Sequence, residues 1–239
     1  MLGSGTINRK FHFYKEALLH ILFPSLCFGC EENSVSIDEM LCINCRLHLP
    51  FTSFENIQNN NVEKLFWGRV PLQFASSTFY YVEKTAIQNI IHQIKYHHAE
   101  DLGIEMGKMM GRQLKEVFER SSIDCCIPMP LHPSKEKKRG YNQASLLCKG
   151  IRETTPIDFN EDLLERKIAT GTQTKKTRIA RWENVSSVFE VNNPSMIQNK
   201  NIVLVDDVIT TGASMEACAR ILLDNGAKTV AIVSLAYTV

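Results

Sequence analysis

The stretch from Asn201 to Ser214 constrains the fold more than any other part of the sequence. Four apolar residues, Ile202 to Val205, lead into two adjacent carboxylates, and a short turn of small and hydroxyl-bearing residues then opens into a helix-like segment. A buried parallel strand of this kind delivers its turn to the carboxyl edge of the sheet, where open α/β folds bind their ligands. The sequence therefore predicts an α/β protein with its ligand site at this turn.

The turn itself has the chemistry of a phosphate site. Gly212 lets the backbone approach an anion closely, and free N–H groups at the helix start point at it. Three hydroxyl side chains lie there: Thr210, Thr211 and Ser214. Asp206 and Asp207 suit sugar hydroxyls and a divalent cation instead, because like charge repels a phosphate. The expected ligand carries both a phosphate and a diol, as ribose 5-phosphate does. The alternative is a solvated turn or a helix cap at Ser214.

Strand-like and helix-like segments alternate along the rest of the chain. Ile87, Ile90, Ile91 and Ile94 repeat at the spacing of one buried helix face, and a Met-rich stripe from Leu102 to Phe118 marks another, more typical of core than of a cofactor site. Further helices are predicted over 142–152 and 214–225, and strands over 75–82, 123–127, 186–191, 201–206 and 228–236. Such alternation predicts βαβ units and a mostly parallel, twisted sheet.

Four of the eight cysteines form two CxxC pairs that are separated by eleven residues: Cys27, Cys30, Cys42 and Cys45. Two residues between thiolates let both sulfurs of a tight turn face one ion, and Gly29 is expected to supply the backbone freedom for that turn. Two such turns complete a tetrahedral shell of four sulfurs, which suits a structural zinc ion. Redox CxxC motifs or incidental cysteines are the alternatives. Cys125, Cys126, Cys148 and Cys218 are expected in the core.

The length of 239 residues allows one large α/β domain with a small appendage. The polar stretch 53–61 is the best boundary. We therefore expect an N-terminal helix and a four-cysteine zinc module in residues 1–60, with the helix over 11–23 packed on the cysteines, and the larger domain in residues 61–239.

The overall charge excludes some classes of protein. Lysines and arginines number 27 against 26 acids, a net charge of +1, so bulk charge does not predict a protein that coats nucleic acid. No run approaches the roughly 18 apolar residues of a membrane span. Charged residues also interrupt the first twenty positions, where a secretory leader would be apolar. We expect a soluble, cytoplasmic protein without membrane insertion.

Residues 202–214 resemble the thirteen-residue PRPP-binding motif of type I phosphoribosyltransferases, and the chain as a whole resembles the ComF/GntX family, which places a double-CxxC module before such a domain. Three further blocks carry the resemblance: Ile94-Lys95-Tyr96, the stretch 128–143 with Pro-Met-Pro-Leu-His and Arg-Gly-Tyr-Asn-Gln, and Arg166, Gln173, Thr174, Arg178, Arg181 and Asn184. The resemblance implies a parallel-sheet type I phosphoribosyltransferase fold with a small zinc-ribbon-like module. Two departures are His97 and His98 in place of a glycine, and Lys135 where arginine is common.

Two basic segments precede the acid pair along the sequence. Residues 135–139 have a net charge of +3, and residues 166–182 hold six basic residues and no acid. Two such loops would bind a pyrophosphate group together with Mg²⁺. Alternatively, the two segments are solvated surface loops or part of a nucleic-acid-binding surface.

The resemblance also implies roles for individual residues. It assigns the 5′-phosphate of PRPP to Thr210, Thr211, Gly212, Ala213 and Ser214. Asp206 and Asp207 take the ribose hydroxyls and Mg²⁺, Arg139 and Lys138 take pyrophosphate, and Lys175 or Arg178 lies on a mobile loop that closes over it. Asp206, Asp207, Arg139 and Arg178 are the catalytic candidates.

Three functions follow from these patterns. The first is an Mg²⁺-dependent phosphoribosyltransferase of nucleotide metabolism that transfers ribose 5-phosphate from PRPP to an unidentified acceptor and releases pyrophosphate. The second is a non-catalytic competence protein that assists DNA uptake through protein partners, by analogy with the family. The third makes the zinc module a nucleic-acid reader, although it lacks dense basic cover. No motif determines the acceptor or the oligomeric state.

Overall fold

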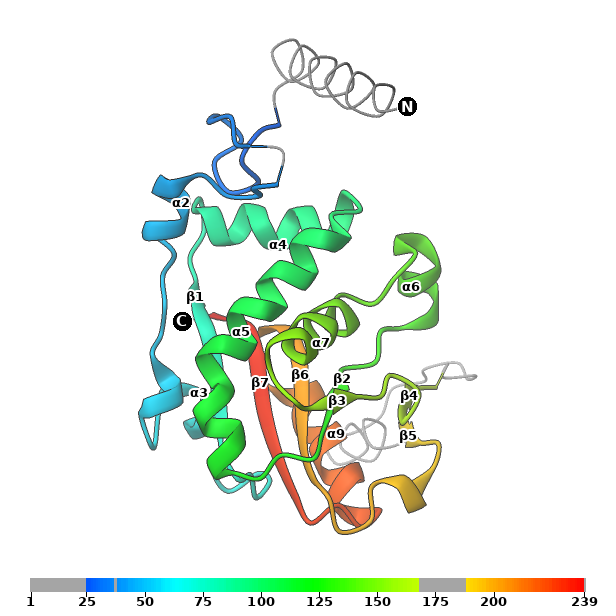
Figure 1. Ribbon diagram of the computed structural model, residues 1–239. Helices are drawn as coiled ribbons and strands as arrows, with labels where there is room; N and C mark the ends of the chain where they lie inside the picture. The colour runs from blue at the N-terminus through cyan, green and yellow to red at the C-terminus, as the bar shows by residue number, and fades with distance from the viewer. Residues whose placement is uncertain (1–24, 37, 168–187, 239) are drawn as a thin grey trace, which may run out of the picture.

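The computed structural model describes residues 25–36, 38–167 and 188–238 (Figure 1). Five strands form one sheet in the order β1-β7-β6-β2-β3, and every pairing within it is parallel. The strands are β1 (Ala75–Tyr81), β2 (Cys125–Pro128), β3 (Asp158–Phe159), β6 (Asn201–Ile209) and β7 (Thr229–Thr238). A separate antiparallel pair joins β4 (Leu164–Arg166) to β5 (Phe189–Val191). The predicted parallel α/β fold is confirmed.

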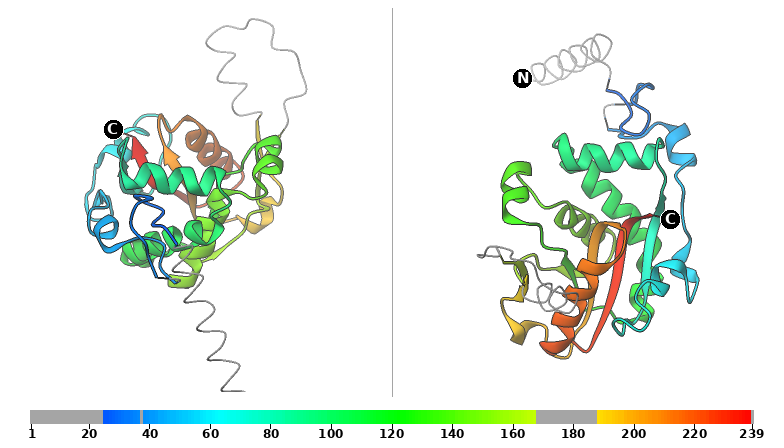
Figure 2. Two further views of the ribbon diagram at one scale, coloured as in Figure 1. Left: turned by 90° about the horizontal axis from the view of Figure 1, so that it is seen from above. Right: turned by 180° about the vertical axis from the view of Figure 1, so that it is seen from behind.

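Helices cover both faces of the sheet (Figures 1 and 2). On one face lie α4 (Ala86–Tyr96), α5 (Glu100–Arg120) and α7 (Gln143–Thr154), and on the other lies α9 (Ala213–Asp224). The side chains of β6 alternate between these layers: Val203 and Val205 belong to the core with α4, α5 and α7, whereas Ile202 and Leu204 belong to the core with α9. This alternation continues into the acid pair and sets its geometry.

Glycines allow α5 and α7 to pack with their backbones in contact. A Cβ atom added at Gly107 of α5 would overlap the carbonyl oxygen of Leu147, and one added at Gly150 of α7 would overlap the carbonyl oxygen of Ile104. Because neither backbone can retreat without moving a whole helix, both positions require glycine. The two helices therefore form one closely packed layer on this face of the sheet.

Most predicted elements are confirmed with small shifts in their ends, and two differ more. The strand expected to stop at Asp206 runs on to Ile209, so both carboxylates belong to the strand. The basic segment expected as a loop forms helix α6 (Pro133–Arg139). The helix is explained by its ends: a proline lies in its first turn, His132 caps its start, and left-handed Gly140 ends it. It has too few apolar residues to show helical periodicity.

The segment proposed as the domain boundary packs against the large domain. It contains the short helix η1 (Phe54–Asn56), and α3 (Asn61–Lys64) begins at its last residue. Asn60 caps α3 and donates a hydrogen bond of 2.8 Å to the carbonyl oxygen of Ala75, at the start of β1. The division into 1–60 and 61–239 stays a prediction, and the helix expected over 11–23 lies outside the described residues. Within the described ranges, every helix is too short or too polar to cross a lipid bilayer.

Candidate functional site

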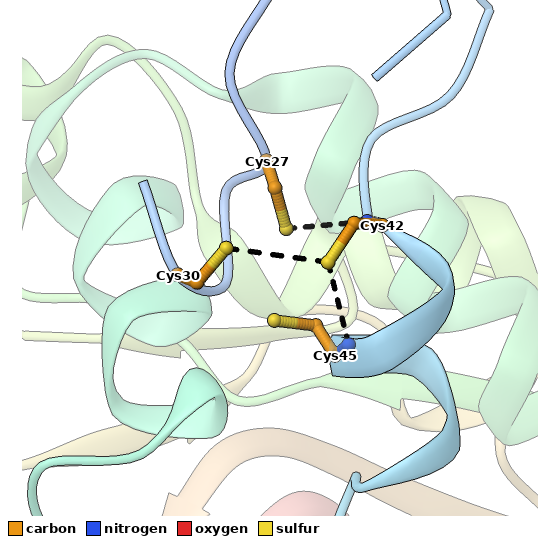
Figure 3. A group of neighbouring side chains, drawn as sticks. All are labelled: Cys27, Cys30, Cys42 and Cys45. Atoms are coloured by element: carbon orange, nitrogen blue, oxygen red, sulfur yellow. Dashed lines mark hydrogen bonds between the residues drawn. The ribbon is translucent and has the colours of Figure 1, made fainter. Parts of the chain in front are cut away.

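The four cysteines of the two CxxC pairs converge on one point (Figure 3). Their Sγ atoms all lie within 4.8 Å of one another, and those of Cys30 and Cys42 are 4.0 Å apart. Four sulfurs at about 2.3 Å from a tetrahedral zinc ion would be separated by about 3.8 Å. All four cysteines are free of disulfides. The cluster therefore has the donors and the spacing that a structural zinc ion needs.

Hydrogen bonds around this cluster favour thiolates. Cys27 Sγ accepts N–H groups from Gly29 at 3.3 Å and from Cys42 at 3.2 Å. Backbone hydrogen bonds from Asn33 and Glu32 lower the pKa of Cys30 to about 6, and one from Cys45 lowers the pKa of Cys42. Burial raises the pKa of Cys45. Because N–H groups that donate to sulfur also stabilise metal-bound thiolates, the surroundings fit zinc as well as the distances do.

Gly29 serves the module differently from the prediction. Its backbone is outside the left-handed region, which Glu31 adopts instead with φ of 59°. A Cβ atom at Gly29 would lie 3.0 Å from Cys45 Sγ and 3.1 Å from Cβ of Ala86, the first residue of α4. The expected backbone freedom was therefore wrong for this position. Glycine is needed because the module is pressed against α4.

The second candidate site lies at the carboxyl edge of the sheet, between β2 and β6. The chain passes from β2 through α7 to β3 on one side, and from β6 through α9 to β7 on the other. Connections that diverge in this way open a crevice between the two strands, which is where open α/β sheets bind ligands. The turn after β6 and the segment that leads from β2 to α6 both lie at this edge of the sheet.

The acid pair at the end of β6 faces two ways. Asp207 is buried and its Oδ2 is held by Lys95 Nζ at 3.0 Å and by Gln143 Nε2 at 3.0 Å. Asp206 is half-buried, on the α9 side, and its Oδ1 accepts the N–H of Asp207 at 2.8 Å. Burial and then the neighbouring Asp207 carboxylate raise the pKa of Asp206 to about 7, against the opposing effects of that N–H and of Lys95. The two carboxylates are chemically distinct.

Lys95 and Gln143 are functional candidates that the sequence assignments did not include. Lys95 lies near the end of α4, and Gln143 is the first residue of α7. Both occur in blocks that carry the family resemblance, Ile94-Lys95-Tyr96 and Asn142-Gln143, and that was the available signal. Only the packing of α4 and α7 against β6 shows that their side chains meet one carboxylate.

The turn after the acid pair presents its small residues to solvent. Thr210, Thr211, Ala213 and Ser214 are exposed, whereas Gly212 is buried with φ of 71°. Gly212 caps α9, and no side chain occupies the cap position. The first N–H groups of this twelve-residue helix therefore have no side-chain cap, and exposed hydroxyls lie next to them in the sequence, an arrangement that suits an anion.

The basic residues after β2 are placed by α6. Lys138 is exposed, and Arg139 is half-buried with its guanidinium 5.6 Å from the ring centre of Tyr96. One Nη of Arg139 is buried without a hydrogen-bond partner. Tyr96 follows Lys95 in α4, so neighbouring residues of one helix contact Asp207 and Arg139. Lys175 and Arg178, assigned to a closing loop, lie outside the described residues.

A parallel sheet with an anion-type turn after β6, preceded by a four-cysteine module, defines a phosphoribosyltransferase-type fold with a zinc-type appendage. A family model described as "Phosphoribosyl transferase domain" matches residues 159–238. "Competence protein F" of Haemophilus influenzae is 24% identical over 222 residues, which cover 91% of this chain and 93% of that protein. The resemblance to the ComF/GntX family is thereby confirmed.

Other relatives match over shorter stretches. "DNA utilization protein YhgH" of Escherichia coli O157:H7 is 28% identical over 152 residues, covering 62% of this chain and 66% of that protein. "Competence protein ComFC" of Bacillus subtilis is 33% identical over 100 residues, covering 42% and 38%. The solved structure of a glutamine phosphoribosylpyrophosphate amidotransferase from B. subtilis aligns over 55% of this chain and 25% of its own, at 19% identity and a TM-score of 0.38, too low to bear on the site.

Proposed function

We propose that the carboxyl edge between β2 and β6 binds PRPP with Mg²⁺ and that the protein transfers ribose 5-phosphate from it to an acceptor. The observation that carries this proposal is the turn from Thr210 to Ser214. It combines exposed hydroxyls, a helix start without a side-chain cap and a left-handed glycine, and it begins three residues after Asp207. A phosphate on the turn would leave the sugar hydroxyls of the same ligand near Asp206, the more accessible of the two acids.

The reaction would exchange two bonds at the anomeric carbon. The bond to the pyrophosphate oxygen breaks with its electron pair leaving on pyrophosphate, and a nucleophile of the acceptor supplies the new pair and loses its proton. Positive charge on the sugar and negative charge on the leaving group both grow in the transition state. The protein therefore contributes by holding the ligand and by stabilising these charges.

The described residues divide this work between them. Thr210, Thr211 and Ser214 would hold the 5′-phosphate, and Asp206 would orient the diol. Arg139, which has an unpaired buried Nη, and Lys138 would face pyrophosphate. Mg²⁺ would neutralise charge on the leaving group, and carboxylate oxygens are ligands that it prefers. Since both Asp207 contacts run to Lys95 and Gln143, its proposed role is to fix those side chains as well as to carry charge.

The binding half of the proposal is tested by calorimetry with PRPP and Mg²⁺. The wild-type chain should bind, and the double variant Asp206→Asn, Asp207→Asn should lose PRPP binding while its circular dichroism stays native. Equal affinity in both proteins would refute the assignment. Turnover is tested separately by pyrophosphate release with a panel of nucleobases and amines. Losing one charge-stabilising group typically costs about 10²–10³ in rate, so Arg139→Ala should be easy to detect.

A non-catalytic competence function is the second candidate, favoured by the names of the relatives "Competence protein F" and "Competence protein ComFC". In this case the protein binds PRPP or is only built like a PRPP-binding protein, and it acts in the cytoplasm through proteins of a DNA-uptake machinery. PRPP binding without pyrophosphate release across the panel would support this candidate over the first.

A further inference from the structure

A segment far outside the matched domain supports the turn after β6. Arg69 follows α3, and its guanidinium reaches the turn: Nη1 donates to the carbonyl oxygen of Thr211 at 3.1 Å and to that of Leu65 at 2.7 Å. Nε donates to Glu216 Oε2 at 2.8 Å, and Nη2 lies 2.5 Å from the same oxygen. One side chain therefore ties α3, the turn and the first turns of α9 together.

The ring of Phe66 completes this support. A Cβ atom added at Gly212 would lie 2.8 Å from two atoms of the Phe66 ring, so the ring packs directly under the glycine. The Arg69 guanidinium lies 6.0 Å from the centre of the same ring. Glycine is therefore required at position 212 for two reasons: its backbone is left-handed, and the Phe66 ring leaves no room for a Cβ atom.

The pairing of Arg69 with Glu216 affects the charge near the start of α9. Glu216 lies four residues after Gly212, is only 7% exposed, and is paired with Arg69 and with Arg220 at 3.3 Å. A buried carboxylate in the first turns of α9 repels an anion at the start of that helix unless its charge is balanced. Arg69 supplies such balance and, through the Thr211 carbonyl, also restrains the turn.

We propose that Arg69 is a positioning residue for the phosphate turn, acting through the Thr211 carbonyl and through Glu216. This inference rests on the proposed function, because the ligand that benefits is the 5′-phosphate of a sugar phosphate. It assigns part of that site to residues 61–70, whereas the matched phosphoribosyl transferase domain begins at residue 159. Arg69 does not touch the phosphate itself.

The test compares ribose 5-phosphate with pyrophosphate, each with Mg²⁺, on the full-length chain. Arg69→Gln should weaken ribose 5-phosphate binding at least about tenfold, about 1.4 kcal/mol, because hydrogen bonds to charged groups are lost. Pyrophosphate, assigned to the other side of the crevice, should change by less than about twofold. Adding Glu216→Gln to Arg69→Gln should restore part of the affinity, since the unbalanced carboxylate is then gone. Arg112→Gln, which removes an exposed pair with Glu105, is the matched control.

Hydrogen exchange on the ligand-free chain gives a second readout. In Arg69→Gln the amides of residues 211–216 should exchange faster, while those of β7 stay protected as in Arg112→Gln. Unchanged exchange together with unchanged ribose 5-phosphate affinity would overturn the inference, as would equal losses for both ligands. Failure of the wild-type chain to bind ribose 5-phosphate and PRPP would instead refute the proposed function, and with it the ligand named here. The two failures are distinguishable.

Discussion

Replacing Lys95 with methionine tests whether the acid pair depends on a partner from α4. Lys95 Nζ lies 3.0 Å from Asp207 Oδ2, and the side chains are 23% and 12% exposed. At that separation and an effective dielectric constant of about 20, the attraction is about 5.5 kcal/mol before desolvation. Desolvation offsets much of it, and removal of one partner from a fully buried pair costs about 3–5 kcal/mol. Because this pair is partly exposed, we expect a loss of about 2 kcal/mol in the free energy of unfolding.

The same substitution should change the titration of Asp206. Lys95 is one of the groups that hold the pKa of Asp206 down against burial and the Asp207 charge. Without it the pKa should rise above its value of about 7, and PRPP binding with Mg²⁺ should require a higher pH. A Met side chain keeps the length of the lysine stem, so packing along α4 is preserved.

Urea unfolding at pH 7.5 measures the free energy of unfolding, and titration calorimetry at several pH values measures PRPP affinity with Mg²⁺. A loss of about 2 kcal/mol corresponds to a fall of about 4–8 °C in Tm for a chain of this size. The cycle with Asp207→Asn isolates the pair: if Lys95 acts through Asp207, the two substitutions together should cost less than the sum of each alone. Strict additivity, or an unchanged pH profile in Lys95→Met, would refute the reasoning.

Three further perturbations have defined outcomes. When the pH falls from 8 to 6, PRPP affinity should fall about tenfold because Asp206 takes up a proton, and the Asp206→Asn control should lack this fall. The free energy of unfolding should change in the opposite direction and decrease as the pH rises from about 4 to 7. The reason is that the native Asp206 keeps its proton to about pH 7, whereas the unfolded one does not. Gly107→Ala should destabilise the chain by about 1–3 kcal/mol in urea unfolding by forcing α5 from α7, whereas Gly68→Ala, with nothing within 4 Å of the new Cβ, should cost only its left-handed strain, about 1 kcal/mol. Elemental analysis should find one zinc per chain, lost in Cys30→Ser and kept in the control Cys125→Ser; full zinc retention in Cys30→Ser would contradict the four-sulfur site.

Local patterns were sufficient where one element carried the whole signal. The four-residue spacing of Ile87, Ile91 and their neighbours predicted the buried face of α4, and the apolar run before Asp206 predicted a buried parallel strand. The prediction of a loop for the basic segment before Gly140 was wrong. Capping and a single proline determine a seven-residue helix there, and because none of its residues is buried it shows no apolar pattern. The end of β6 was misplaced because charged residues do not read as strand even when ladder hydrogen bonds continue through them.

The sequence alone determined that four sulfurs could meet one ion and that an acid pair precedes an anion-type turn, because those groups are near neighbours along the chain. It did not separate Asp206 from Asp207, whose different surroundings follow from the alternation of a strand between two packed layers. Nor did it pair Arg69 with Glu216, which lie 147 positions apart. Contacts of that kind depend on how α3, α4 and α7 pack around the sheet, and no local pattern encodes the packing that brings distant charges together.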